Sequence, residues 1–398
     1  MHPIITAVRH TLIRGLLTVS AAVNRLTRGR LPHFMFADER DLTDIKSTVR
    51  VTGKTDTGVT LTKFKSDGTI DNGDFKILSA TDLHLGPDDR KKKVFVKGYK
   101  LNRKTVKNFI RTVKEERPDL VILTGDVILS DCQQTDAVQF SRMMEKLGVY
   151  WCYVFGNHEA REEKEYFKYL LYKGLSVYPH CIDLFGDPSL FGYGNFRVDI
   201  ADGKNSLRKS LFFFDSGRNI QDKVKEQLNL PSDLNGYDFI KPSQTAWYDR
   251  EIKNLKAKYG ENVKSICFMH IPLPEFEEVF NWNEEKSVAE PTGKAKILYG
   301  WQYESVGCPP YNSGLFETGK KNGTLQAVYA GHDHVNDFCA EYDGVYLVYT
   351  QCTGYNVYSM EDRADWDEKD CHYGTTLTVL KPDGSLEFHQ KKNNEYLK

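Results

Sequence analysis

The feature that most constrains the fold is a repeated pairing of a short apolar run with polar residues at its end. Residues 75–80 lead directly into Thr-Asp-Leu-His, 120–123 into Thr-Gly-Asp, and 151–155 into Gly-Asn-His-Glu. Two later runs, 265–269 and 325–330, end in a histidine and in Gly-His-Asp-His. Continuous apolar runs of this length are typical of strands covered on both faces. We therefore expect several buried strands whose ends carry the polar residues.

Helical segments separate these strands. The apolar residues between them recur at helical spacing in four segments: 102–116, 137–147, 161–172 and 244–258. Strands that alternate with helices predict an α/β fold with a largely parallel, covered sheet. Two short strands are expected within 48–64 and a β-rich tail within 345–388, whereas 276–310 is expected to be a long loop or small insert.

The polar clusters are expected to converge on one site. In an open α/β sheet the carboxyl ends of the strands face a common crevice. A single histidine or Gly-Asp pair at a strand end is usually structural, so the joint order of the clusters is what favours a functional site. The candidate residues are Asp82, His84, Asp126, Asn157, His158, Glu159, His270, His332, Asp333 and His334.

The residue types in these clusters favour a transition-metal site. Carboxylate oxygen and imidazole nitrogen suit Mn, Fe or Zn, whereas a set of oxygens alone would indicate Mg or Ca. The sequence does not distinguish among the three metals. Asp333 should project to the opposite face from His332 and His334, because side chains alternate along a strand end, which predicts a second-shell or solvent position.

The order of the clusters resembles the five motif blocks of the calcineurin-like metallophosphoesterases, over residues 75–334. Phe214-Asp-Ser-Gly and Phe268-Met-His-Ile-Pro-Leu-Pro-Glu-Phe are similar to the small branch related to purple acid phosphatases. The resemblance implies a four-layer α/β/β/α sandwich with its active site at the carboxyl ends of the strands. It also implies a catalytic domain over 46–398, with core motifs at 75–334 and a β-rich part at 335–398.

The resemblance further implies a site for two metal ions. Its expected ligands are Asp82, His84 and His334 for one ion, Asn157, His270 and His332 for the other, and Asp126 as the bridge. In the family, hydroxide held by the two ions attacks phosphorus in line. His158 would protonate the departing oxygen, with Asp82 or Glu159 able to orient its ring.

The implied function is a metal-dependent phosphatase that acts on phosphorylated small molecules or other phosphoesters. A nucleotide or phospholipid phosphodiesterase is an alternative within the class. The alternative from another class is a non-catalytic scaffold that keeps the fold, although such members lose metal ligands or the histidine that stands here as His158.

Two departures from the motifs of known branches narrow the choice of branch within the family. Purple acid phosphatases have a ferric-binding tyrosine where this chain has Leu129, and a glycine where it has His84, so a colourless site with exchangeable ions is expected. Serine/threonine protein phosphatases have a phosphate-binding arginine in the second block. The segment Gly125-Asp-Val-Ile-Leu-Ser-Asp lacks it, so their specialised phosphoprotein machinery is not supported.

Charge and the N-terminal segment say little about partners. The net charge of −1 gives no overall attraction to nucleic acid, so nucleic-acid binding is not expected. The extension 1–45 begins as a basic amphipathic helix, whose longest uncharged stretch, 15–24, is too short to span a bilayer. An organelle-targeting segment, a weakly associating membrane-surface helix and a helix packed on the domain all stay open. The compartment is not predicted.

Two other groups are candidates for substrate contact. The basic run 90–93 would attract an anionic substrate if it lay near the crevice, although such runs are usually solvated surface. The second group consists of aromatic residues that could stack a nucleobase or hold a lipid, although core packing is the commoner role: Trp247, Trp282, Trp301 and Tyr311.

Overall fold

The computed structural model describes residues 42–86, 95–130, 133–159, 165–182, 186–203, 206–358, 360 and 372–393. The predicted N-terminal helix and the basic run 90–93 lie outside the described residues, and the predicted domain boundary stays a prediction. No helix within the described ranges combines the length and the apolar character that crossing a membrane requires.

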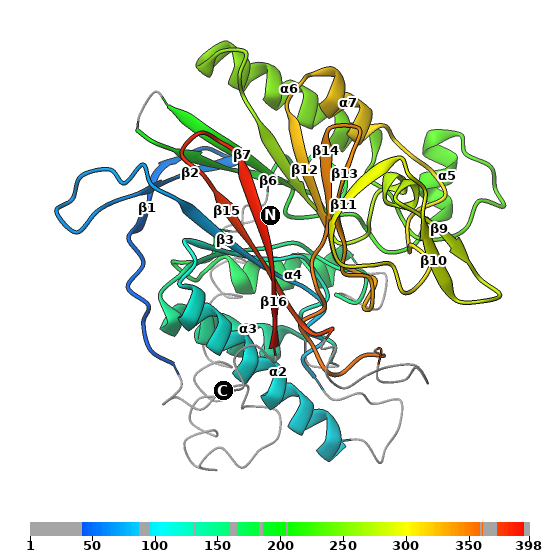
Figure 1. The fold of residues 1–398 in the computed structure, drawn as a ribbon, viewed down its shortest axis with the longest axis horizontal. Helices are drawn as coiled ribbons and strands as arrows, with labels where there is room; N and C mark the ends of the chain where they lie inside the picture. The colour runs from blue at the N-terminus through cyan, green and yellow to red at the C-terminus, as the bar shows by residue number, and fades with distance from the viewer. Residues whose placement is uncertain are drawn as a thin grey trace, which may run out of the picture.

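Two β-sheets stacked face to face form the centre of the molecule (Figure 1). The strands of the five-stranded sheet are, in order, β16 (Leu386–Lys392), β15 (Gly374–Leu380), β3 (Phe75–Ala80), β4 (Leu120–Leu123) and β5 (Tyr150–Tyr153). Those of the nine-stranded sheet are β1 (Val49–Lys54), β2 (Gly58–Lys63), β6 (Phe196–Ala201), β7 (Leu207–Phe213), β8 (Ser265–Phe268), β12 (Leu325–Ala330), β14 (Val345–Tyr349), β13 (Cys339–Tyr342) and β11 (Ala295–Tyr299).

Helices cover the outer face of each sheet, which confirms the four-layer sandwich (Figure 1). The five-stranded sheet packs against α2 (Phe95–Glu116), α3 (Gln133–Leu147) and α4 (Glu165–Leu175). The nine-stranded sheet packs against α6 (Pro242–Tyr259) and α7 (Leu315–Lys321). The short helix α5 (Asp222–Leu228) lies to one side, above the hairpin of β9 (Phe280–Asn283) and β10 (Val288–Pro291) in this view.

Central strands are apolar on both faces because each face meets a different core. In β4, Val121 and Leu123 pack toward the helices, whereas Leu120 and Ile122 face the other sheet. Burying an aliphatic side chain of this size stabilises the fold by roughly 1.5–3 kcal/mol. The predicted parallel arrangement is confirmed at the sheet centres, where β3, β4 and β5 run parallel and β7, β8, β12 and β14 do so in the other sheet.

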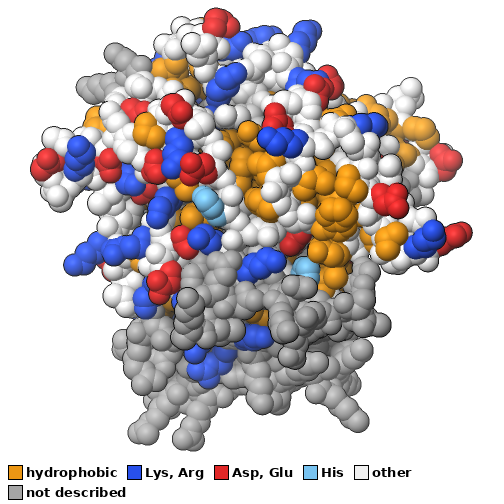
Figure 2. Space-filling model, viewed as in Figure 1, with side chains coloured by type: hydrophobic (Ala, Val, Ile, Leu, Met, Phe, Trp, Pro, Cys, Tyr) orange, Lys and Arg blue, Asp and Glu red, His pale blue; other side chains and the backbone are white. Residues whose placement is uncertain are grey.

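Of the two alternatives predicted for 276–310, a long loop or a small insert, the long loop is wrong. The segment contains the β9–β10 hairpin and then β11, which pairs with β13 at the edge of the large sheet. Burial alternates along β11, but its partner lies later in the chain, so no local turn signal marks it. Apolar side chains gather near this edge, where Val288 and Leu298 are exposed, while charges of both signs are scattered elsewhere on the same face (Figure 2).

Lys209 on β7 is buried between the two sheets. Its Nζ donates to the Gly384 carbonyl oxygen at 2.8 Å and contacts the side-chain oxygen of Gln326. Burial, followed by the charge of Lys264, lowers the pKa of Lys209 to about 7, while Asp383 acts in the opposite direction. The ammonium form is therefore disfavoured in the folded protein near neutral pH.

Replacing Lys209 should change how stability depends on pH. Between about pH 7 and 10 the unfolded chain keeps the lysine proton and the folded chain releases it, so the wild-type free energy of unfolding rises with pH. Lys209→Met removes this contribution, which amounts to as much as about 1.4 kcal/mol per pH unit. Urea unfolding of both proteins at several pH values measures the difference. Parallel pH profiles would contradict the prediction, and Lys253→Met, at a lysine with 68% side-chain exposure, is the control.

Candidate metal centre

The loops that follow five strands meet at one end of the sandwich. On the five-stranded sheet, the Asp82 N–H donates to Gly125 O at 3.1 Å and the His84 N–H to Asp126 O at 3.0 Å. On the other sheet, the Gly331 N–H donates to His270 O at 3.0 Å. These backbone hydrogen bonds continue the parallel pairing past the strand ends. The predicted ligands are therefore placed by the sheets.

Hydrogen bonds join the two sheets at this point, and two of them hold His270 and His332. The ring Nδ1 of His270 lies 2.8 Å from the Thr124 carbonyl oxygen, and the His332 N–H donates to Asp82 Oδ2 at 3.0 Å. The first contact fixes which ring nitrogen of His270 faces the site, because Nδ1 must donate its proton to the carbonyl. All the atoms involved are buried.

Two groups of buried side chains result. Asp82 Oδ1 lies 3.4 Å from His84 Nε2 and 3.5 Å from His334 Nε2, which makes the first group. In the second group, His270 Nε2 lies 3.3 Å from Asp126 Oδ2 and 2.9 Å from Asn157 Oδ1. His332 joins the second group through Nδ1, 3.1 Å from the same oxygen of Asn157. All seven predicted ligands thus lie together, and their assignment to two ions stays a prediction.

Both carboxylates reach toward both groups. Asp126 Oδ2 is 3.3 Å from His270 and 3.6 Å from His84, and Asp82 also belongs to the group formed by Asp126 and His270. The other oxygen of each carboxylate is held by the protein: Asp82 Oδ2 accepts from Thr81 Oγ1 at 2.8 Å, and Asp126 Oδ1 accepts the His158 N–H at 2.8 Å. The remaining oxygens point at imidazole nitrogens.

Orphaned polar atoms indicate that this cluster fits cations. Asp82 Oδ1, both ring nitrogens of His84 and His334 Nδ1 are buried and have no hydrogen-bond partner among the described residues. An unsatisfied buried polar group costs about 1–3 kcal/mol, more when charged. A cation held between these oxygen and nitrogen atoms would satisfy several of them at once.

The backbone at the ligands is strained. Asp82, His84, Asp126 and His332 have φ values of 51°, 44°, 50° and 77°, in the left-handed region that costs non-glycine residues about 1–3 kcal/mol each. Two glycines beside the ligands are required by space: a Cβ at Gly125 would lie 2.4 Å from His270 Nδ1, and one at Gly156 would lie 2.1 Å from Asp126 Oδ1. The strain is concentrated where the side chains must converge.

The histidines respond oppositely to their surroundings. Burial lowers the pKa of His332 to about 3, and the charge of His270 adds to the effect. For His270 burial also acts to lower the pKa, but Asp126 and Asp82 outweigh it and raise the value to about 10. Burial alone would raise the pKa of Asp126, yet the charge of His270 holds it well below its usual range. Paired carboxylates therefore stay charged here, as metal ligands must.

His158 and Glu159 have separate roles, although the sequence suggested that Glu159 could orient the His158 ring. The His158 ring is 33% exposed, and its Nε2 lies 3.8 Å from Asp126 Oδ2. The Glu159 carboxylate is turned away from solvent and accepts backbone N–H groups of Asp126, Val127, Ile128 and Gly156 at 2.7–3.1 Å. Glu159 thus fixes the Asp126 loop rather than orienting the His158 ring.

Asp333 is buried, so the solvent alternative for it is wrong. Its carboxylate accepts the Gly307 N–H at 3.0 Å and Asn336 Nδ2 at 3.2 Å, and it also accepts the Tyr349 hydroxyl. Burial and the charge of Glu304 raise its pKa to about 7. The Asp333 side chain thus links the segment near 307 to the loop that carries His332 and His334.

A family model described as calcineurin-like phosphoesterase matches residues 75–336. The chain belongs to the calcineurin-like phosphoesterase family. In Arabidopsis thaliana it is similar to "Probable inactive purple acid phosphatase 28", with 30% identity over 77% of this chain and 75% of that protein, and to "Probable inactive purple acid phosphatase 29", with 29% identity over 75% and 76%. In Saccharomyces cerevisiae it is similar to "Phosphatase DCR2", with 31% identity over 69% of this chain and 46% of that protein.

One solved structure supports the fold of this calcineurin-like phosphoesterase. A dimetal phosphatase from Danio rerio superposes with a TM-score of 0.50 over 80% of this chain and 96% of its own, at 14% identity. The family model confirms the predicted family, and the relatives named purple acid phosphatases agree with the predicted branch. The family implies divalent metal ions, and their identity stays open.

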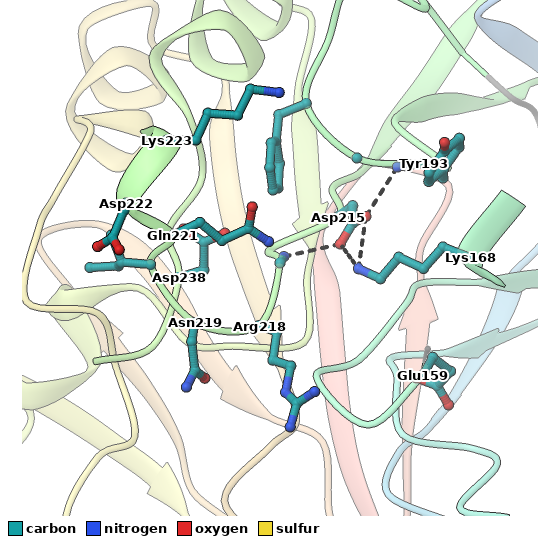
Figure 3. Close-up of a pocket in the computed structure, with 14 residues that line it drawn as sticks. Glu159, Lys168, Tyr193, Asp215, Arg218, Asn219, Gln221, Asp222, Lys223 and Asp238 are labelled. Carbon is teal, nitrogen blue, oxygen red and sulfur yellow. Dashed lines mark hydrogen bonds and ion pairs between the residues drawn. The ribbon is translucent and has the colours of Figure 1, made fainter. Parts of the chain in front are cut away.

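A cavity of about 410 Å³ adjoins the site of this phosphoesterase (Figure 3). Glu159 lines one end of it, and Arg218 and Asp238 lie on its walls. Lys168 Nζ is fixed by Asp215 at 2.7 Å, within the Phe214-Asp-Ser-Gly segment noted in the sequence. The cavity runs from Glu159, which supports the Asp126 loop, along the loop that follows β7.

Two aromatic residues at the centre were missed in the sequence. Tyr237 lies with its ring 4.3 Å from that of His332, and Tyr358 lies 4.3 Å from that of His334. Of the aromatic residues named from the sequence instead, Trp247 is fully buried and Trp301 packs on Phe280. Neither tyrosine belongs to a motif or a periodic segment, so no local signal marks them.

Glu159→Gln should destabilise the protein even without metal. An amide in place of the carboxylate puts a donor against two of the four N–H groups that Glu159 accepts. The expected loss in the free energy of unfolding is about 2–4 kcal/mol. Denaturant unfolding in the presence of a chelator measures it, with the exposed Glu290→Gln as the matched control. A loss no larger than that of the control would refute this role.

Proposed function

We propose that this chain is a metal-dependent phosphatase that hydrolyses phosphoesters at a binuclear centre. One observation carries the proposal: two groups of buried nitrogen and oxygen ligands share the carboxylates Asp82 and Asp126 at the converging strand ends. Among the described residues neither buried ring nitrogen of His84 has a hydrogen-bond partner, which a purely structural histidine would be expected to have. The proposed ligands are those predicted from the sequence.

The chemistry requires cations and a proton donor. Bound divalent ions, of which Mn, Fe and Zn suit this donor set, supply Lewis-acid stabilisation of phosphoryl charge and lower the pKa of water. The protein holds one oxygen of each shared carboxylate through Thr81 and the His158 N–H and directs the other into the site. The ring of His158 is the partly exposed imidazole of the cluster, so its Nε2 is suited to give a proton to the departing oxygen.

The names of the relatives leave two outcomes to distinguish. The Arabidopsis thaliana relatives are named inactive, and the Saccharomyces cerevisiae relative is named a phosphatase. A scaffold with no activity would not need the full ligand set or His158. Their presence together in this chain favours hydrolysis over the scaffold alternative. Rates on a phosphomonoester and on the corresponding diester distinguish a monoesterase from a diesterase.

The proposal predicts metal-dependent hydrolysis. Purified protein with added Mn or Zn should hydrolyse p-nitrophenyl phosphate or its diester analogue and should bind two ions per chain. Asp126→Asn should lower the bound metal toward one ion and reduce kcat by at least about 10²-fold, because it weakens the shared carboxylate. Circular dichroism should show that the variant is folded. Less than one ion bound by the wild type, with no hydrolysis of either ester, would refute the proposal.

His158→Ala should lower kcat more for esters with poor leaving groups than for esters with good ones. A general acid increases the rate about 10²–10⁴-fold when the leaving group is an alkoxide, because an alkoxide needs a proton as it departs. The rate increase is much smaller when the leaving group is p-nitrophenolate. The variant should therefore lose far more kcat on glycerol phosphate than on p-nitrophenyl phosphate while keeping its metal content. His180→Ala is a matched control, because its ring is 34% exposed beside a carboxylate, Glu145, like the 33% exposed ring of His158. An equal loss on both substrates would argue against a proton donor.

A further inference from the structure

Two exposed tyrosines stand at the metal centre. Tyr237 is 37% exposed and Tyr358 is 51% exposed. Among the described side chains these are the exposed aromatic residues, since the other exposed large apolar residues are aliphatic: Val51, Ile70, Val177, Val288 and Leu298. Each tyrosine contacts a histidine of the predicted ligand set. Exposed aromatic rings that contact the side chains of a candidate metal site are typical of a ligand-binding surface.

The rings lie on different sides of the centre. Tyr237 meets the ring of His332 edge-on, with an interplanar angle of 88°, and His332 belongs with Asn157 and His270. Tyr358 lies over His334 at 32°, and His334 belongs with Asp82 and His84. The two tyrosines therefore flank the two ligand groups, and each keeps part of its ring open to solvent.

The Tyr358 ring and the backbone at Tyr237 are held in place from outside the centre. The Tyr358 hydroxyl donates to Glu304 Oε2 at 2.8 Å, and the Glu304 carboxylate accepts the Val335 N–H at 3.1 Å, next to His334. Tyr237 lies opposite Asn219 in a short antiparallel bridge, and the N–H of the adjacent Asp238 donates to Arg218 O at 3.0 Å. Rigid aromatic rings lose little conformational entropy on contact with a ligand.

Space for a substrate group lies beside Tyr237. Its neighbour Asp238 and the opposing Arg218 both line the 410 Å³ cavity that reaches Glu159 (Figure 3). A group attached to a phosphoryl held at the centre would therefore pass between an aromatic ring and this cavity. The ring face favours a planar, polarisable group over a small alkyl group.

We propose that Tyr237 and Tyr358 form an aromatic clamp that selects phosphoesters with a planar aromatic leaving group. The clamp rests on the proposed function, since it assigns the leaving group of that reaction. The tyrosines are positioning residues: they hold the group that departs, while the metal ligands and His158 contact the reacting atoms. Loss of a ring should therefore weaken discrimination between leaving groups and leave recognition of the phosphoryl group intact.

Binding of two non-hydrolysable probes tests the clamp independently of turnover. The full chain, loaded with Mn or Zn, is titrated calorimetrically with phenylphosphonate and with methylphosphonate. The wild type should bind phenylphosphonate about tenfold more tightly, as one favourable aromatic contact allows. Tyr237→Leu and Tyr358→Leu should each reduce this preference several-fold, with the affinity for methylphosphonate within about twofold of wild type.

Conservative variants separate the ring from the hydroxyl. Tyr237→Phe and Tyr358→Phe keep the rings and should keep the preference. Tyr259→Leu controls for loss of a half-buried tyrosine elsewhere, because it ends α6 just before β8 and so lies at the opposite end of the strands from the centre.

Equal binding of the two phosphonates by the wild type would overturn the clamp, as would equal losses for both probes in the Leu variants. Absence of binding by either probe would overturn the clamp and the proposed function together. A phenylphosphonate preference that needs the rings, in a protein that hydrolyses no phosphoester, would support the clamp and contradict the phosphatase assignment.

Discussion

The hydrogen bonds that join the two sheets at the metal centre are the constraint on which the site depends. From the nine-stranded sheet, the His270 ring contacts Thr124 O and the His332 N–H donates to Asp82 Oδ2, and both acceptors follow strands of the five-stranded sheet. Each sheet alone carries only part of the predicted ligand set. Because both contacts are buried, breaking either would leave a polar group unsatisfied in the interior, so the relative position of the sheets and the geometry of the centre are coupled.

The centre is assembled at a cost that the rest of the fold must offset. Four of the predicted ligands have left-handed backbone conformations, and several of their polar atoms lack partners among the described residues. Strain of this kind persists only where the surroundings over-determine the conformation. The surroundings fix the conformation here because Glu159 holds the Asp126 loop through four N–H groups and the strands on either side are packed on both faces. Preorganised ligands avoid reorganisation when a charged substrate binds.

The site differs from that of a purple acid phosphatase in a way that the fold explains. Leu129 occupies the position of the ferric-binding tyrosine and is buried, with its N–H donating to Leu85 O. A leucine supplies no phenolate at this position, whereas His84 Nε2, where those enzymes have glycine, lies 3.4 Å from Asp82 Oδ1. The relationship to that branch is thus one of fold and family, and a colourless site with exchangeable ions stays a prediction.

Local patterns in the sequence were enough to predict the central strands that end in polar clusters, the long helices between them and the ligand candidates. Apolar runs such as 120–123 and the polar residues after them depend on short-range periodicity, which a single chain displays directly. Only the tertiary structure decided that Glu159 supports a loop, that Asp333 is buried, that 276–310 adds strands, and that Tyr237 and Tyr358 stand at the centre. These features arise from contacts between segments distant in the chain, and such contacts leave no periodic or motif signal in the residues that make them.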